Sequence, residues 1–152
     1  MLDEVLAGSG STDGSDDDSQ LVANAKKIAL FTIGVAYQRY VDALEKQQEV
    51  IMHIADIVTE TFAMESVLLR SRKLEARGKE TIAADICAVF LRDAMAREEI
   101  SARKVLGACS EGETLRTNMT LLRRLARYEP ADDVVLRRKI ASRLLARERF
   151  IV

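Results

Sequence analysis

One histidine and three acidic residues could share a helix face in the middle of the chain. His53 lies four residues after Glu49, three before Asp56 and seven before Glu60. A helix would place all four on one side, a spacing that can bring ligands to a metal ion. A di-iron bundle, however, needs a Glu-x-x-His pair on each of two helices, and this sequence has one histidine. We therefore interpret these residues as a solvated polar face and predict no metal site.

A second acidic pattern lies near the start of the chain. Asp13, Ser15 and Asp17 alternate as do the first ligands of an EF-hand loop. The sixth position of that loop requires glycine, and here it is Asp18. The twelfth position requires a bidentate glutamate, and here it is Asn24. Because the pattern fails at both positions, we predict a linker and not a calcium site.

Nucleophilic catalysis would depend on the same single histidine. His53 would have to act as the base for any serine or cysteine nucleophile, and a lone histidine is poor support for a triad. Cys87 lies in the apolar run 82–90 and is predicted to be a buried hydrophobe. With Cys109 it forms no CxxC motif, so we expect neither zinc nor a disulfide, as is typical of a reducing compartment.

Nucleotide-binding motifs are missing as well. The sequence has neither GxGxxG nor GxxxxGK[ST], which excludes a Rossmann or P-loop domain. We therefore predict no catalytic, cofactor-binding or metal-binding residue in this chain.

The C-terminal region is basic. Residues 115–152 hold ten bases and four acids, a bias too mild to predict a nucleic-acid partner. Few aromatic residues lie among these bases, so stacking on single-stranded nucleic acid is not expected. Two interpretations stay open, a protein interface and a solvated surface. The bases concerned are Arg123, Arg124, Arg127, Arg137, Arg138, Lys139, Arg143 and Arg147.

Composition predicts the architecture that must position these residues. Ala, Leu, Glu, Lys and Arg make up close to half of the 152 residues, with one Pro and seven Gly. We predict an all-α protein, an up-down bundle of three long and two shorter helices, and exclude a β-sandwich or barrel. Residues 1–19 are expected to form a flexible acidic Gly/Ser linker, and residues 20–152 the helical bundle.

Apolar periodicity places the helices. The long helices are expected at about residues 20–45, 49–76 and 80–106, with a turn near residues 46–48. The shorter helices are expected from Thr114 to before Pro130, and from Pro130, with Asp132 and Asp133 in the first turn, to about Arg147.

Two of these helices have predicted inward stripes. The predicted stripe of the first helix includes Val22, Ala25, Ala29, Ile33, Ala36, Tyr40 and Leu44. That of the third helix includes Ile82, Ile86, Ala94, Arg97, Ser101 and Val105.

No segment predicts membrane insertion or secretion. The longest apolar run, residues 28–36, is half as long as a membrane span. The first twenty residues lack the basic and apolar regions of a signal peptide, so we expect a cytoplasmic protein.

The order of several helix-packing residues resembles a known family. The segments concerned are Gln47–Glu49, Ala55–Asp56, Phe62–Met64, Leu68–Arg70 with Arg72, and the ending 121–150. Over residues 21–152 the chain resembles the extra C-terminal domain of bacterial acyl-CoA dehydrogenases of the very-long-chain class.

That resemblance implies a function without a catalytic residue here. In the family, the catalytic part binds FAD and an acyl-CoA thioester, and a glutamate removes the α-proton while hydride passes to the flavin in fatty-acid β-oxidation. The added domain holds none of these groups and packs on the catalytic part. We therefore expect no cofactor in this chain, FAD in the parent enzyme, and no activity from the chain alone.

Other interpretations and partners follow from the residues. The alternative function is a freestanding helical adaptor or ligand-binding bundle, such as the effector domain of a transcriptional regulator. The helix around residues 28–36 is apolar nearly all round, so we predict a homodimer that uses this helix and residues 134–147. Membrane contact is not expected, because the acidic run Asp13–Asp18 would be repelled by an anionic surface.

Overall fold

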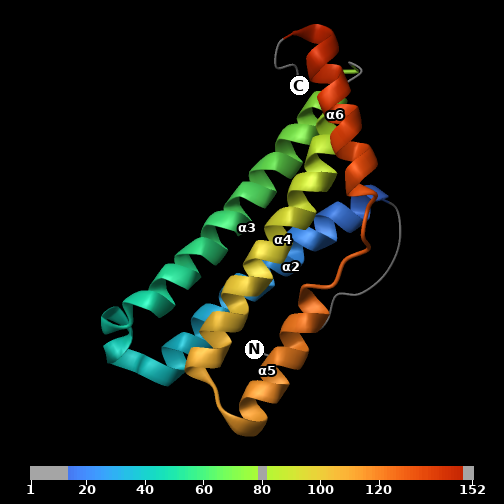
Figure 1. The fold of residues 1–152 in the computed structure, drawn as a ribbon. Helices are drawn as coiled ribbons and strands as arrows, with labels where there is room; N and C mark the ends of the chain where they lie inside the picture. Colours follow the sequence, from blue (N-terminus) through green and yellow to red (C-terminus); the bar gives the residue numbers. More distant parts are fainter. Residues whose placement is uncertain (1–13, 79–81, 149–152) are drawn as a thin grey trace.

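The computed structural model describes residues 14–78 and 82–148. These residues form α2 (Gly14–Tyr40), the 3₁₀ helix η1 (Val41–Lys46), α3 (Gln48–Glu75), α4 (Ala83–Cys109), α5 (Gly112–Leu125) and α6 (Asp133–Arg147). Over the described ranges there is no strand, so the predicted bundle of three long and two shorter helices is confirmed. Figure 1 shows α2, α3 and α4 side by side, with α5 along one end of this trio and α6 at the other.

The core lies where α2, α3 and α4 meet. Its largest fully buried apolar side chains include Ile28 on α2, Ile57 and Met64 on α3, and Leu91 and Met95 on α4. Burial of a side chain of this size contributes about 1.5–3 kcal/mol each, so this junction supplies much of the stability. α5 packs on α4 and α2, and α6 packs on α4.

The predicted inward stripes are partly wrong, by one residue in each case. On α2, Ala25, Ala29 and Ala36 are buried as predicted, but Ile33 is exposed and Thr32 is fully buried in its place. The Thr32 hydroxyl donates to the carbonyls of Ile28 and Ala29 within its own helix, which satisfies it in an apolar core.

The same shift occurs on α4. Arg97 and Ser101 were predicted to face inward, but Arg97 is exposed and Ser101 half-buried. Glu98 and Ala102 are fully buried instead. The sequence did not predict Glu98 to face the core because charged residues are rarely fully buried, so the inward stripe was assigned to Arg97 and Ser101.

The start of α2 differs from the predicted linker. Residues 14–19 are helical, whereas a linker was expected to extend to residue 19; residues 1–13 lie outside the described residues. Arg92 on α4 forms ion pairs with Asp17 and Asp18, and Arg72 on α3 donates to the Ser19 hydroxyl. These long-range contacts stabilise the helix over residues 14–19, although this segment has few apolar residues. Its acidic side chains also favour a helix N-terminus.

The chain breaks near residues 46–48 as predicted, but the first α-helix ends five residues before its predicted end at about residue 45. The regular α-helix ends at Tyr40, and Val41 has a left-handed φ of 43° that favours glycine. The chain then continues as η1, and Gln47 is the N-cap residue of α3, which begins at Gln48. None of the helices within the described ranges is long and apolar enough to cross a bilayer.

Candidate functional site

The predicted polar face on α3 does not converge on one point. His53 Nδ1 is buried, lies 3.9 Å from Asp56 Oδ2 and has no hydrogen-bond partner. Glu60 is instead bound to Arg97 on α4. Within residues 14–78 and 82–148, no group of three or more His, Cys, Asp or Glu side chains is placed to hold a metal ion. The structure therefore brings no metal-ligand set together around His53.

The two cysteines are free and buried. Burial raises the pKa of Cys87 to about 11, and the carboxylate of Asp18 adds to the increase. Burial also raises the pKa of Cys109, although Arg39 opposes this. Because the thiolate is the nucleophilic form, both side chains are inert thiols near neutral pH.

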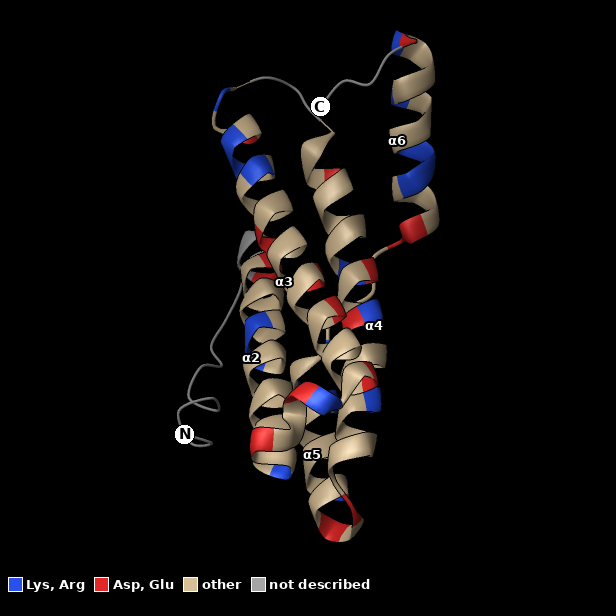
Figure 2. Ribbon diagram, turned by 90° about the vertical axis from the view of Figure 1, so that its left-hand side faces the viewer, with Lys and Arg blue, Asp and Glu red and all other residues tan. Residues whose placement is uncertain are grey.

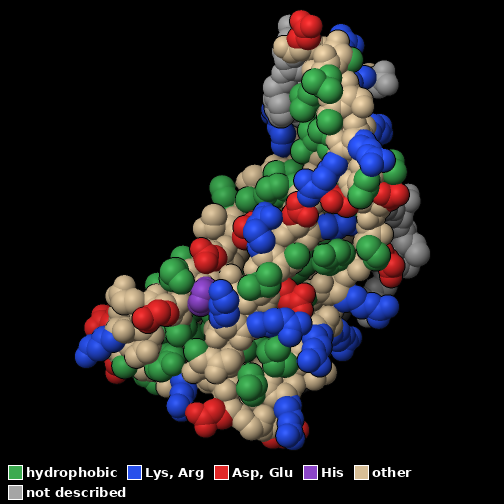
Figure 3. Space-filling model, viewed as in Figure 1, with side chains coloured by type: hydrophobic (Ala, Val, Ile, Leu, Met, Phe, Trp, Pro, Cys, Tyr) green, Lys and Arg blue, Asp and Glu red, His purple; other side chains and the backbone are tan. Residues whose placement is uncertain are grey.

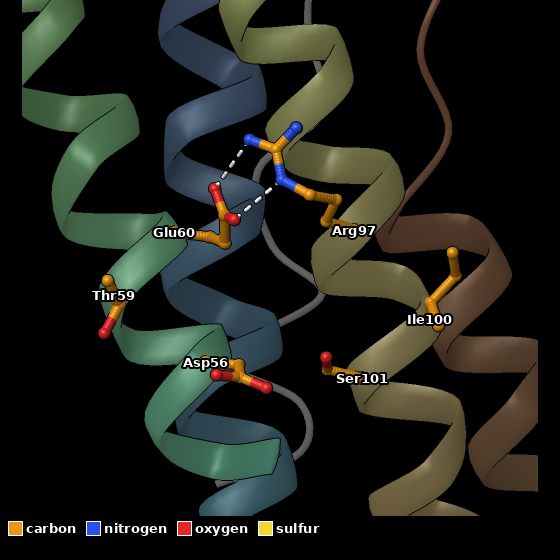
Figure 4. Close-up of a pocket in the computed structure, with 6 residues that line it drawn as sticks. All are labelled: Asp56, Thr59, Glu60, Arg97, Ile100 and Ser101. Atoms are coloured by element: carbon orange, nitrogen blue, oxygen red, sulfur yellow. Dashed lines mark hydrogen bonds and ion pairs between the residues drawn. The ribbon is translucent and has the colours of Figure 1, made fainter. Parts of the chain in front are cut away.

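A polar pocket lies in a groove between α3 and α4. It has a volume of about 370 Å³. Arg97 donates from Nε and Nη2 to the two carboxylate oxygens of Glu60, at 2.7 and 3.0 Å (Figure 4). The hydrogen bond to Glu60 raises the pKa of Arg97, so both side chains stay charged. Because they bind each other, Arg97 is not a free cation for a ligand. The lining residues are Asp56, Thr59, Glu60, Arg97, Ile100 and Ser101.

A second pocket, of about 320 Å³, lies between the end of α3 and the start of α4. Its lining offers Arg70 as the one ionisable side chain, among serines and apolar residues. A single cation among apolar groups supplies neither an acid–base pair nor a nucleophile with its base. The lining residues are Ser66, Val67, Arg70, Ser71, Leu74, Ala83 and Ile86.

Glu98 is the ionisable residue that sequence reasoning missed. Its side chain is fully buried on α4, and its Oε2 lies 3.4 Å from the Thr61 hydroxyl on α3. Burial raises the pKa of Glu98 to about 8, the contact with Thr61 opposes the increase, and the charge of Glu60 adds to it. A spacing of four residues from Ala94 and from Ala102, both buried, is the signal that would have placed it inside.

The C-terminal bases are partly used within the fold. Arg137 on α6 binds Asp93 on α4 at 2.6 Å, and Lys139 binds Asp85 at 2.6 Å. Figure 2 shows α6 beside the upper part of the bundle, with Lys and Arg positions along its ribbon. α6 has no buried residue, and its Leu145 is 78% exposed. The helix is therefore attached largely by ion pairs.

Uncovered apolar side chains also line the outer side of α2 and α3. On α2 these side chains recur at three or four residues, and on α3 at four or seven, so each set forms one stripe. Lys26 on α2 and Glu65 on α3 form an ion pair that joins the two stripes. We name the surface made by the two stripes the α2–α3 face. Its apolar residues are Leu30, Ile33, Tyr37, Val58, Phe62 and Leu69.

Comparisons with known proteins place this arrangement among dehydrogenases. The family described as "Acyl-CoA dehydrogenase, C-terminal domain" matches residues 24–124. A probable acyl-CoA dehydrogenase of Bacillus subtilis (strain 168) is 35% identical over 140 residues, which cover 90% of this chain and 24% of that protein. The crystal structure of an acyl-CoA dehydrogenase complexed with FAD from Bacillus anthracis is similar at a TM-score of 0.93 and 33% identity. That similarity covers 99% of this chain and 27% of the solved one, so the chain spans about a quarter of each relative.

Proposed function

The chain belongs to the acyl-CoA dehydrogenase C-terminal domain family, and from this we propose that it serves as the non-catalytic interaction and oligomerisation domain of an FAD-dependent acyl-CoA dehydrogenase. One observation carries the proposal: nearly the whole chain superposes on about a quarter of a much longer dehydrogenase, at a TM-score of 0.93. The other three quarters of such a protein supply the catalytic part. The parent protein would act in fatty-acid β-oxidation.

The two pockets found among the described residues do not fit FAD. In the α3–α4 groove the one arginine is held by both oxygens of Glu60, and Asp56 beside it would repel a diphosphate. The second pocket offers a single arginine among apolar and serine side chains. The flavin and the acyl-CoA thioester therefore belong to the catalytic part of the parent protein, and we derive no step of the reaction in this chain.

The role that we propose for the chain is to bind protein partners through its uncovered surfaces. The described residues form a packed core of α2, α3 and α4, with apolar side chains left uncovered on α2, α3 and α6. Contiguous apolar patches beyond a few hundred Å² mark interaction sites. The partners we propose are the catalytic part of the same dehydrogenase and, for the chain alone, a second copy in a homodimer.

Two finer assignments also stand as proposals. We assign the parent to the very-long-chain class, because the order of packing residues at 47–49, 55–56 and 62–64 resembles that class. We assign the chain to the cytoplasm, because Cys87 and Cys109 are both free thiols, which is typical of a reducing compartment.

The purified chain is expected to bind no flavin and to oxidise no acyl-CoA. The reason is the lack of an unpaired acid–base couple or a diphosphate cradle in the pockets that the structure describes. The chain should be expressed with excess FAD, and its visible absorbance and dye reduction with acyl-CoA measured. The Bacillus anthracis enzyme, solved with FAD, is the positive control. A yellow chain, or one that reduces the dye, contradicts the proposal.

A chimaera tests the interaction directly. The matching quarter of the Bacillus subtilis relative should be replaced with this chain and compared with the relative that lacks this quarter. We expect the chimaera to keep the melting temperature and flavin content of the intact relative, and the shortened protein to lose several degrees. A chimaera no more stable than the shortened protein would show that this chain does not dock on a catalytic part.

A further inference from the structure

The α2–α3 face is an apolar surface that the described helices leave bare. Leu30 and Phe62 are each 72% exposed, and Tyr37 and Leu69 are each 58% exposed. Ile33 and Val58 complete the surface. The two helices pack side by side, as Figure 2 shows. Large side chains exposed at this level on neighbouring helices are expected to be covered by a partner.

The charges on this face neutralise each other. Lys26 and Glu65 are the charged members of the two stripes, and Lys26 Nζ lies 2.5 Å from Glu65 Oε1. A partner needs no charge of its own to satisfy them. A second copy carries the same paired charges and the same apolar side chains, so it meets no electrostatic repulsion there.

The other uncovered surfaces suit a second copy less well. α6 carries five bases and one acid, so two α6 helices would repel each other. The side that α3, α4 and α6 present in Figure 3 mixes acidic and basic side chains with apolar ones.

The area of the face matches what a specific dimer requires. At about 200 Å² for a fully exposed large apolar residue, the six side chains expose on the order of 700 Å². A specific interface buries roughly 800 Å² on each partner, and the largest apolar patch of a typical monomer is about 300–600 Å². A two-fold contact through this face would therefore form an ordinary dimer interface.

We propose that two copies of this chain associate through their α2–α3 faces about a two-fold axis, which brings two helix pairs into a four-helix arrangement. The inference rests on the proposed homodimer and assigns it a surface. The sequence predicted a dimer surface on α2 and α6, whereas the proposed surface lies on α2 and α3. Closed two-fold contacts between identical patches are the commonest form of homo-oligomer.

Sedimentation equilibrium of the full chain tests the assignment. The wild-type chain is expected to be a dimer at about 100 μM. Leu30→Glu on α2 and Phe62→Glu on α3 should each weaken the dimer at least about 30-fold, the effect of losing a central interface residue. Leu145→Glu on α6 is the matched control, since Leu145 is 78% exposed but lies outside the face, and it should leave the dimer unchanged.

The outcomes separate the face from the proposed function. A monomeric wild-type chain at 100 μM, or a dimer that Leu145→Glu dissociates and Phe62→Glu does not, overturns the assignment of the face. Neither result affects the chimaera experiment, which tests docking on a catalytic part. Because Leu30 and Phe62 are exposed, both glutamate variants should keep the helical circular dichroism of the wild-type chain. A variant that loses this signal is replaced by Leu30→Gln or Phe62→Gln, for which we expect the same dissociation of the dimer.

Discussion

Glu98→Gln is expected to stabilise the chain at neutral and alkaline pH and to have little effect in acid. The Glu98 side chain is fully buried on α4, and burial raises its pKa to about 8 from an ordinary value of 4.5. Glutamine keeps the shape of the carboxyl group without ionising. The free energy of unfolding should be measured by urea denaturation of both proteins at several values between pH 4.5 and pH 8.5.

The sign follows from the direction of the pKa shift. Below pH 4.5 Glu98 is neutral in both the folded and the unfolded chain, and its titration costs nothing. As the pH rises, the unfolded chain ionises first, so the wild-type chain loses about 1.4 kcal/mol per pH unit until the folded carboxyl also ionises near pH 8. The advantage of the glutamine variant should therefore grow by about 3 kcal/mol between pH 5 and pH 8.

The hydrogen bonds around Glu98 agree with a neutral carboxyl. The Thr61 hydroxyl has one hydrogen, which it donates to the Ile57 carbonyl at 2.8 Å. The same hydroxyl lies 3.4 Å from Glu98 Oε2, which accepts a longer and weaker hydrogen bond from it. The other carboxyl oxygen has no partner, and a buried unpaired carboxylate would be costly.

Glu113→Gln provides the matched control. Glu113 is 82% exposed and paired with Arg116, so its replacement should give the same small change at every pH above 5. If the Glu98→Gln and wild-type stability curves run parallel from pH 5 to pH 8, Glu98 ionises normally and is accessible to water.

The helical architecture could be predicted from the sequence because helix formation and apolar periodicity depend on residues that are close together in the chain. Helix formers, one proline and apolar residues at three- or four-residue spacing predict an all-α bundle without reference to distant residues. Both predicted bounds of α3 and the predicted C-terminal end of α6 lie within one residue of those observed, whereas α6 begins at Asp133, three residues after the predicted start at Pro130. α4 begins three residues later than predicted, after the segment 79–81 that the structure does not describe.

Local patterns could not choose which of two adjacent residues faces the core. On α4, Arg97 and Glu98 are both charged, and periodicity alone allows either to be inside. The neighbouring helix decides, because Glu60 on α3 holds Arg97 at the surface while Thr61 lies against Glu98. The exposure of Leu30 and Phe62 likewise depends on how α2 and α3 pack, so the α2–α3 face was not predictable from either helix alone.

The beginning of α2 was missed for the same reason, and it leads to the second prediction. Arg92→Ala is expected to lower the free energy of unfolding by about 2 kcal/mol at pH 7, less than the 3–5 kcal/mol of a fully buried pair. The Arg92 side chain is 17% exposed and lies 3.3 Å from Asp18 and 3.5 Å from Asp17. Its Nε donates to the Glu129 carbonyl at 3.1 Å and its Nη1 to the Ala88 carbonyl at 3.0 Å. One side chain thus ties α2, α4 and the segment before α6 together.

The pH dependence of the Arg92→Ala effect and the behaviour of Arg92→Lys test whether the ion pairs with Asp17 and Asp18 cause the loss of stability. Burial raises the pKa of Asp18 and Arg92 opposes this, so removing Arg92 should raise that pKa further. A raised folded-state pKa destabilises the chain above the ordinary pKa of the carboxyl, so the loss caused by Arg92→Ala should shrink as the pH falls toward 4. Arg92→Lys keeps the charge without the planar set of donors and should lie between alanine and wild type.

A double-mutant cycle with truncation completes the test. Two shortened chains, beginning at residues 14 and 20, differ only by the segment that carries Asp17 and Asp18. In the wild-type background the shorter chain should be less stable by about 1–2 kcal/mol, because it leaves Arg92 half-buried without its carboxylates. In the Arg92→Ala background the same truncation should cost little, since the two changes remove the same contacts. If the two truncation costs are equal, Arg92 does not hold the start of α2, and the helix over residues 14–19 depends on other contacts.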